Sequence, residues 1–156
     1  MLKQYNSILV AVDGSKEAES ALNKAVDVAK RNNATLYIVH VIDMRAFESM
    51  TSYDETLEKD AASEANKTLK EYTDYAHNNG LTDVIDIIEV GIPKRVLSNE
   101  LQEKYNIDLI MLGATGLNTM ERILIGSVSS YVARHATCDV LIVRTDMNNN
   151  PIKSDK

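Results

Sequence analysis

Three glycines and a serine near the C-terminal end of the chain lie between a strand-like run and a helix-like run. Gly113 and Gly116 are separated by two residues, and nine further residues lead to Gly126 and Ser127. Glycine lets backbone N–H groups approach a ligand closely and permits positive φ. When such a loop opens a helix, the free N–H groups of the helix terminus favour an anion. Three glycines with a serine at the start of a helix therefore favour a cradle for a phosphate chain over a set of unrelated turns.

An acidic residue follows the first apolar run of the chain. Residues 7–12 read Ser-Ile-Leu-Val-Ala-Val, and Asp13 ends this run in the sequence Asp-Gly-Ser. Its carboxylate could accept hydrogen bonds from ribose hydroxyls or help hold a hydrated Mg²⁺ that bridges phosphates. It could equally serve only the turn, because Asp-Gly after a strand is common turn chemistry. The residues alone leave both roles open.

Strand-like and helix-like segments alternate along the chain. The β-type runs cover residues 7–12, 35–42, 84–90, 107–112 and 139–144, and helical spacing of small and apolar residues follows each of the first four. This alternation is typical of a parallel sheet with helices on both faces. Ligands bind such sheets beyond the carboxyl ends of the strands, where the strand order reverses.

We therefore expect a single-domain α/β fold over residues 1–145, a doubly wound, five-stranded parallel sheet in the order 3-2-1-4-5. In this order strands one and four are neighbours at the reversal, so the loops after them, which contain Asp13 and Gly113, line one crevice. Residues 146–156 hold three successive Asn and a Pro, and are predicted to form a flexible tail.

The composition restricts the possible partners. The 156 residues carry a formal net charge of −6, which disfavours nucleic acid and anionic membrane surfaces. The longest apolar run near the N-terminus, residues 8–12, is too short for a signal peptide or a membrane span, so a cytoplasmic protein is expected. The single cysteine, Cys138, excludes an intrachain disulfide and is predicted to be a buried, inert thiol.

Taken together, these motifs resemble the universal stress protein family over about residues 5–144. The ATP-binding pattern of that family is Gly, two residues, Gly, nine residues, Gly, then Ser or Thr, and the chain matches it in full. The segment Ile8–Ser15 resembles the family's opening strand with its Asp, and His40-Val41 resembles the end of its second strand. Residues 127–143 are similar to its closing helix and strand.

The resemblance implies that the chain binds ATP with Mg²⁺ or Mn²⁺ and has a regulatory or stress-resistance role. Asp13 would contact ribose or the metal, the backbone of Val41 would read the adenine edge, and Gly113 would lie near the ribose. The phosphates would be bound by Gly116, Gly126, Ser127 and Val128, assisted by the hydroxyls of Ser127 and Ser129. The resemblance also implies a homodimer through strand 139–144. One departure is Ala114-Thr115, where many members carry a basic residue; Arg122 could compensate.

Other functions fit the sequence less well. The chain has neither G-x-x-x-x-G-K-[ST] nor, in its first βα turn, G-x-G-x-x-G. A slow ATPase or a nucleotide-dependent signalling enzyme is the main alternative, but no nucleophile, base and acid form a recognisable set, so we expect no enzyme. A phosphoryl-accepting domain would need an acidic neighbour for Asp13, where the chain has Val12. A member that has lost its ligand would not need the complete glycine pattern.

Overall fold

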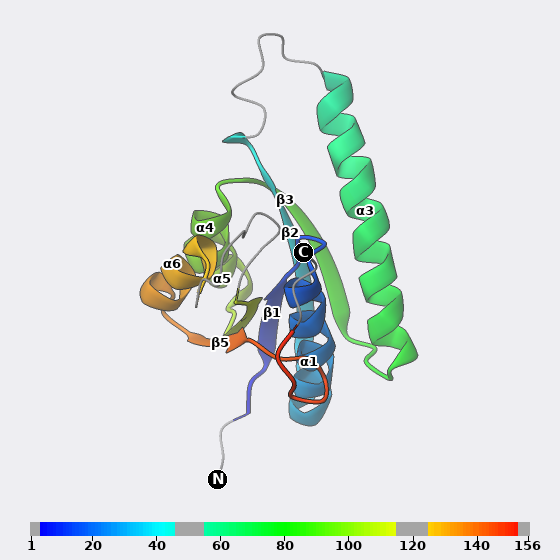
Figure 1. Cartoon of the computed structure of the whole chain (residues 1–156), viewed down its shortest axis with the longest axis vertical. Helices are drawn as coiled ribbons and strands as arrows, with labels where there is room; N and C mark the ends of the chain where they lie inside the picture. The colour runs from blue at the N-terminus through cyan, green and yellow to red at the C-terminus, as the bar shows by residue number, and fades with distance from the viewer. Residues whose placement is uncertain (1–3, 46–54, 115–124, 153–156) are drawn as a thin grey trace.

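The computed structural model describes residues 4–45, 55–114 and 125–152, without the side chains of residues 55–58 (Figure 1). At its centre is a sheet of parallel strands in the order β3-β2-β1-β4-β5, which confirms the predicted fold class and strand order. The strands are β1 (Ser7–Ala11), β2 (Thr35–Asp43), β3 (Val84–Gly91), β4 (Leu109–Gly113) and β5 (Asp139–Val143).

Helices cover both faces of this sheet, as Figure 1 shows. On one face lie α1 (Lys16–Asn32) and the long α3 (Glu55–Asn78). On the other lie α6 (Ser127–His135) and a continuous helical segment made of α4 (Pro93–Arg95), the π-helical turn η1 (Val96–Glu100) and α5 (Leu101–Tyr105). The sequence predicted this last segment as an uninterrupted α-helix and gave no sign of the π turn.

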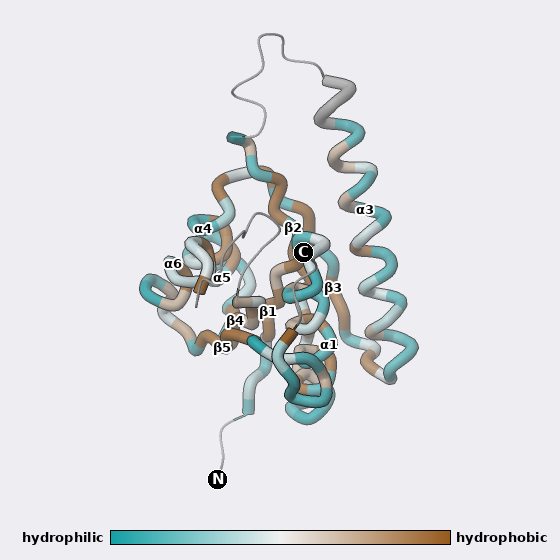
Figure 2. Tube along the Cα trace, viewed as in Figure 1, coloured by the Kyte–Doolittle hydropathy of each residue, from teal (hydrophilic) through white to brown (hydrophobic). Residues whose placement is uncertain are grey.

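The alternation of side chains along β1 separates two apolar layers. Ile8 and Val10 are fully buried in the layer shared with α1 and α3, whereas Leu9 is fully buried in the layer shared with α5 and α6. Figure 2, which colours the backbone by residue hydropathy, shows apolar strands in the interior and a largely hydrophilic α3 outside. Because the sheet is covered on both faces, its strands read as continuous apolar runs, which is why they were recognisable in the sequence.

The first turn of α1 packs closely against the end of β4. A Cβ atom on Gly113 would lie 2.8 Å from the backbone carbonyl carbon of Glu17, so a side chain at Gly113 would collide with main chain. Gly113 thus has a packing role that does not depend on any ligand. The contact holds the start of α1 beside the end of β4.

A C-terminal turn (residues 145–152) lies against α1, where the sequence predicted a flexible tail. The carboxylate of Asp146 accepts two backbone N–H groups of this turn, each at 2.9 Å. The ammonium group of Lys24 in α1 donates to the Thr145 hydroxyl at 2.7 Å and to the Asn149 side-chain oxygen at 3.1 Å. Asp and Asn stabilise such turns through their own side chains, and composition alone does not separate this from a loose tail.

Candidate functional site

The candidate site lies at the carboxyl ends of β1 and β4. These strands pair directly, with Ile8 opposite Leu109 and Val10 opposite Met111. Each is followed by a loop that leads into a helix, α1 after β1 and α6 after β4. The strand order reverses at this pair, as the sequence predicted, because β2 lies on the far side of β1 and β5 on the far side of β4. The described residues that follow the two strands therefore lie at the same end of the sheet, where parallel sheets of this kind bind their ligands.

The backbone of Val41 faces the space beyond the end of β1. Ala11 is the last residue of β1 that pairs with β2, opposite Val39, and the N–H of Val12 then donates to the Val39 carbonyl at 2.8 Å. In a strand, residues two apart direct their N–H and C=O to the same side, so Val41 directs both groups toward the β1 side. Neither the N–H nor the C=O of Val41 forms a hydrogen bond with any described residue. Half-buried Val41 thus offers one donor and one acceptor at the mouth of the crevice.

Asp13 forms part of the turn that joins β1 to α1. One of its carboxylate oxygens accepts the backbone N–H of Ser15 at 3.0 Å, and Gly14 between them has φ of 86°. The turn role considered from the sequence is therefore present. The other carboxylate oxygen has no hydrogen-bond partner in the described part of the chain, and the side chain is only half-buried, so Asp13 can contact a ligand as well.

The two helices that begin at the crevice differ in how their N-termini are capped. In α1 the Ser15 hydroxyl accepts the N–H of Ala18 at 3.1 Å, which uses one of the free donors of that helix. In α6 the N-cap position is Gly126, which has no side chain to offer. The orphan N–H groups at the N-terminus of a helix need partners, so an anion would be bound by α6 in preference to α1.

The hydrogen bonds at the start of α6 involve few of the described residues. The N–H of Gly126 donates to the Ala114 carbonyl at 2.6 Å, which brings the two ends of the glycine loop together. Those of Ser127, Val128 and Ser129 have no partner among the described residues. These are three of the predicted phosphate-binding positions, and they lie on the first turn of α6. Gly116 and Arg122 lie outside the described residues.

Ser129 differs from Ser127 in what its hydroxyl contacts. The Ser129 side chain is buried and donates to the carbonyl oxygen of Gly113 at 2.7 Å, so it ties the start of α6 to the end of β4. The Ser127 side chain is exposed at the first position of α6. Of the two hydroxyls that the resemblance places near phosphates, that of Ser127 is the accessible one.

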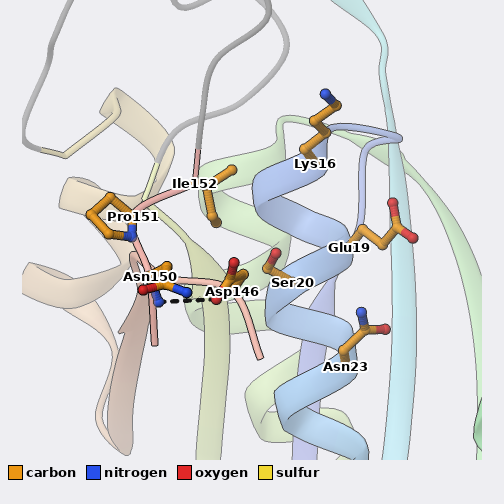
Figure 3. Close-up of a pocket in the computed structure, with 8 residues that line it drawn as sticks. All are labelled: Lys16, Glu19, Ser20, Asn23, Asp146, Asn150, Pro151 and Ile152. Carbon is orange, nitrogen blue, oxygen red and sulfur yellow. Dashed lines mark hydrogen bonds between the residues drawn. The ribbon is translucent and has the colours of Figure 1, made fainter. Parts of the chain in front are cut away.

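A separate open pocket of about 870 Å³ lies between α1 and the C-terminal turn (Figure 3). None of the predicted site residues lines it. Its walls are polar on the α1 side and include Pro151 and Ile152 on the other. The lining residues are Lys16, Glu19, Ser20, Asn23, Asp146, Asn150, Pro151 and Ile152.

The described ranges hold no group of three or more His, Cys, Asp and Glu side chains that could bind a metal ion by themselves. A divalent ion at the crevice would need the oxygens of a phosphate ligand in addition to the Asp13 carboxylate, because Mg²⁺ is bound through one or two carboxylates together with substrate phosphates. Asp13 fits this limited role.

Replacing Asp13 with Ala or Asn separates its two roles. Asp13→Asn keeps an oxygen for the Ser15 N–H and loses the charge, whereas Asp13→Ala loses both. If Asp13 contacts the ligand, we expect both variants to weaken ATP binding by about 1–3 kcal/mol, the scale of a hydrogen bond to a charged group. Only Asp13→Ala should also lower the melting temperature. Calorimetric titration and thermal denaturation measure the two effects, and unchanged affinity in both variants would leave Asp13 a turn residue.

The Cys138 thiol is predicted to be unreactive while the protein is folded. The Cys138 side chain is half-buried, and its partial removal from water disfavours the thiolate and raises the pKa of Cys138 to about 11. At about pH 8 we expect iodoacetamide to label the folded protein roughly a hundredfold more slowly than the guanidinium-unfolded chain, whose thiol titrates near 8.5. The pKa of Cys138 is higher in the folded protein than in the unfolded chain. The protonated thiol therefore contributes to the stability of the fold below about pH 8.5, and this contribution is lost as the pH rises toward 11. Equal labelling rates would contradict the assignment, and Cys138→Ser is the control for labelling elsewhere.

No helix within the described ranges is long and apolar enough to cross a membrane.

Several known proteins are similar to this chain in sequence and in fold over most of their length. A protein of Staphylococcus haemolyticus named as a universal stress protein is 49% identical over 142 residues, which cover 91% of this chain and 86% of that protein. The structure of the universal stress protein UspA from Lactobacillus plantarum has a TM-score of 0.83 and 34% identity, and the match covers 92% of this chain and all of that one. A universal stress protein solved in complex with cAMP has a TM-score of 0.69 and 30% identity, over 90% of this chain and 98% of that one. The universal stress protein family itself matches residues 4–144, so the chain belongs to the universal stress protein family.

Proposed function

We propose that this protein binds ATP in the crevice between β1 and β4 and acts as a nucleotide-dependent regulatory protein, in the glycine-motif branch of its family. The observation that carries the proposal is that two sets of backbone groups without partners among the described residues lie at the same end of the sheet. The unpaired N–H and C=O of Val41 lie on one side, and the uncapped start of α6 lies on the other. The first suits a base and the second suits phosphates.

The adenine base matches what Val41 offers. An adenine edge carries an amino donor next to a ring-nitrogen acceptor, which complements one carbonyl and one N–H group. Guanine carries an oxygen acceptor at the position of that amino group, so it would place an acceptor against the Val41 carbonyl. A solved family member is in complex with cAMP, a nucleotide that has the same base, which supports the choice of adenine.

The phosphates are assigned to the glycine loop and the start of α6. The N–H groups of Ser127, Val128 and Ser129 supply donors, and the partial positive charge of the helix N-terminus favours the anion. The Ser127 hydroxyl is exposed beside them. Asp13 would contact the ribose or share a Mg²⁺ or Mn²⁺ ion with the phosphates. When bound, that ion neutralises phosphate charge.

We propose that ATP acts as a ligand and is hydrolysed slowly or not at all. Hydrolysis needs a residue that positions or activates the attacking water. Among the described residues near the proposed site, Asp13 is assigned to the ribose or the metal ion, and Nδ1 of His40 is held against a carbonyl oxygen. A turnover of about 1 s⁻¹ or more, in the ordinary range for enzymes, would favour the slow-ATPase alternative.

The experiment that tests the proposal is a calorimetric titration of the purified protein with ATP and Mg²⁺, with GTP as the matched control. We expect ATP to bind at least roughly tenfold more tightly than GTP, a difference of about 1.4 kcal/mol. Mass spectrometry of small molecules released on denaturation is the second readout. No heat of binding together with no nucleotide released would overturn the proposal.

A further inference from the structure

His40 makes a contact across the end of the β1–β2 ladder. Its side chain is half-buried, and Nδ1 lies 2.9 Å from the carbonyl oxygen of Val12. A carbonyl only accepts, so Nδ1 carries the hydrogen and the imidazole donates. The contact lies one residue past the end of β1 and one residue before Asp13.

The carbonyl that His40 occupies is the one that would otherwise pair with Val41. The regular ladder of parallel strands runs from the N–H of Val12 to the Val39 carbonyl, and its next rung would run from the N–H of Val41 to the Val12 carbonyl. That rung is absent within the described residues, and β1 ends at Ala11 instead. The His40 side chain has taken the place of the Val41 N–H as the donor.

We propose that His40 is a positioning residue that keeps the Val41 N–H free for a base by satisfying the Val12 carbonyl in its place. A buried or half-buried carbonyl needs a donor, and without the imidazole the next rung of the regular ladder would supply the Val41 N–H. The ladder would then extend by one rung, and the group that reads adenine would be lost. This rests on the proposed function only for the identity of the ligand, because the competition between two donors is a property of the free protein.

Two substitutions test the competition. His40→Leu removes the donor and puts an apolar side chain of moderate size in its place. His40→Asn is the matched control, because its side-chain amide nitrogen occupies nearly the position of imidazole Nδ1 and can donate to the same carbonyl. Amide hydrogen exchange of Val41 in the ligand-free protein is the primary readout, with Val39, inside the ladder, as the internal reference.

In the unmodified protein we expect the Val41 amide to exchange faster than that of Val39. In His40→Leu its exchange should slow roughly tenfold or more, while ATP affinity falls roughly tenfold, about 1.4 kcal/mol. His40→Asn should restore both values, and ¹⁵N spectra of the unmodified protein should show His40 with hydrogen on Nδ1. Unchanged Val41 exchange in His40→Leu would overturn the proposal, as would an Asn variant that behaves like Leu.

The outcome for His40 stays separate from the outcome for the ligand. If the unmodified protein does not bind ATP, the proposed function fails, but the exchange of Val41 in the free protein still decides whether His40 holds the ladder open. If ATP binds and His40→Leu changes neither exchange nor affinity, only the role of His40 fails. Melting temperatures of both variants show whether a loss of affinity reflects a loss of fold.

Discussion

Replacing Gly126 with Asp is expected to weaken ATP binding by roughly a hundredfold or more, about 2.7 kcal/mol, while the protein stays folded. Gly126 has φ of −69° and ψ of 166°, a conformation that any residue adopts, so the backbone tolerates a side chain there. Asp is also a favourable N-cap residue and should stabilise α6 by a few tenths of a kcal/mol relative to Gly. Its carboxylate would accept the N–H groups of Val128 or Ser129 and place negative charge where the phosphates are expected.

The opposite signs of the two effects make this test informative. Calorimetric titration measures the loss of affinity, and thermal denaturation measures the gain or retention of stability. Gly126→Asn is the matched control, since it caps the helix equally well without the charge. We expect its affinity to lie between those of Gly126→Asp and the unmodified protein. A stable Asp variant that binds ATP normally would mean that the phosphates are not held by α6.

The second large effect is expected at the outer edge of β5. This strand lies at one end of the sheet, and Leu141 on it is 43% exposed. The Val143 carbonyl accepts the Ala114 N–H, so alternate residues Val140 and Ile142 direct their backbone groups away from β4. An open, apolar strand edge favours pairing with a second strand, and twofold pairing is the commonest oligomer symmetry. We propose that two copies of the chain pair along β5.

Two substitutions should convert the expected dimer to monomers. Leu141→Lys puts a charge on the exposed face of β5. Ile142→Pro removes an outward N–H without removing a rung to β4, so the sheet itself should remain. Sedimentation at micromolar concentration gives the oligomeric state, and circular dichroism checks the fold. A monomeric unmodified protein would contradict the proposal, and so would folded variants that remain dimeric.

The fold could be predicted from the sequence because its determinants are local and repeated. Apolar runs such as residues 7–12 and 107–112 are typical of strands buried on both faces, and the spacing of Ala and Leu between them is helical. The order of the strands followed from the handedness of the connections and from where a glycine loop and an acidic turn must meet. The boundaries of β1, β2 and β5 fell within one residue of the predicted ones.

The site could be predicted only in part, because its decisive contacts join residues that no local pattern links. The glycine spacing pointed to Gly126 and Ser127, but not to the packing of Gly113 on Glu17 or the Ser129 hydrogen bond to the Gly113 carbonyl. Nothing in the sequence indicated that His40 bonds a carbonyl 28 residues earlier. Such contacts depend on how helices and strands are placed against each other, which residue types do not encode. The only signal for His40 was its position next to Val41, a residue of the proposed adenine site.

The central place of β1 in the sheet has a consequence for how the chain is made. Ser7 pairs with Thr35 on one side, but Ile8 pairs with Leu109 on the other, a separation of 101 residues. During synthesis β1 and β2 can join early, and the second edge of β1 must wait until about two thirds of the chain has emerged. Until then an apolar strand with unpaired backbone groups is open to neighbouring nascent chains. The pairing of β1 is thus complete only after β4 has been made, and chaperones or rapid synthesis would shorten the time for which its second edge is exposed.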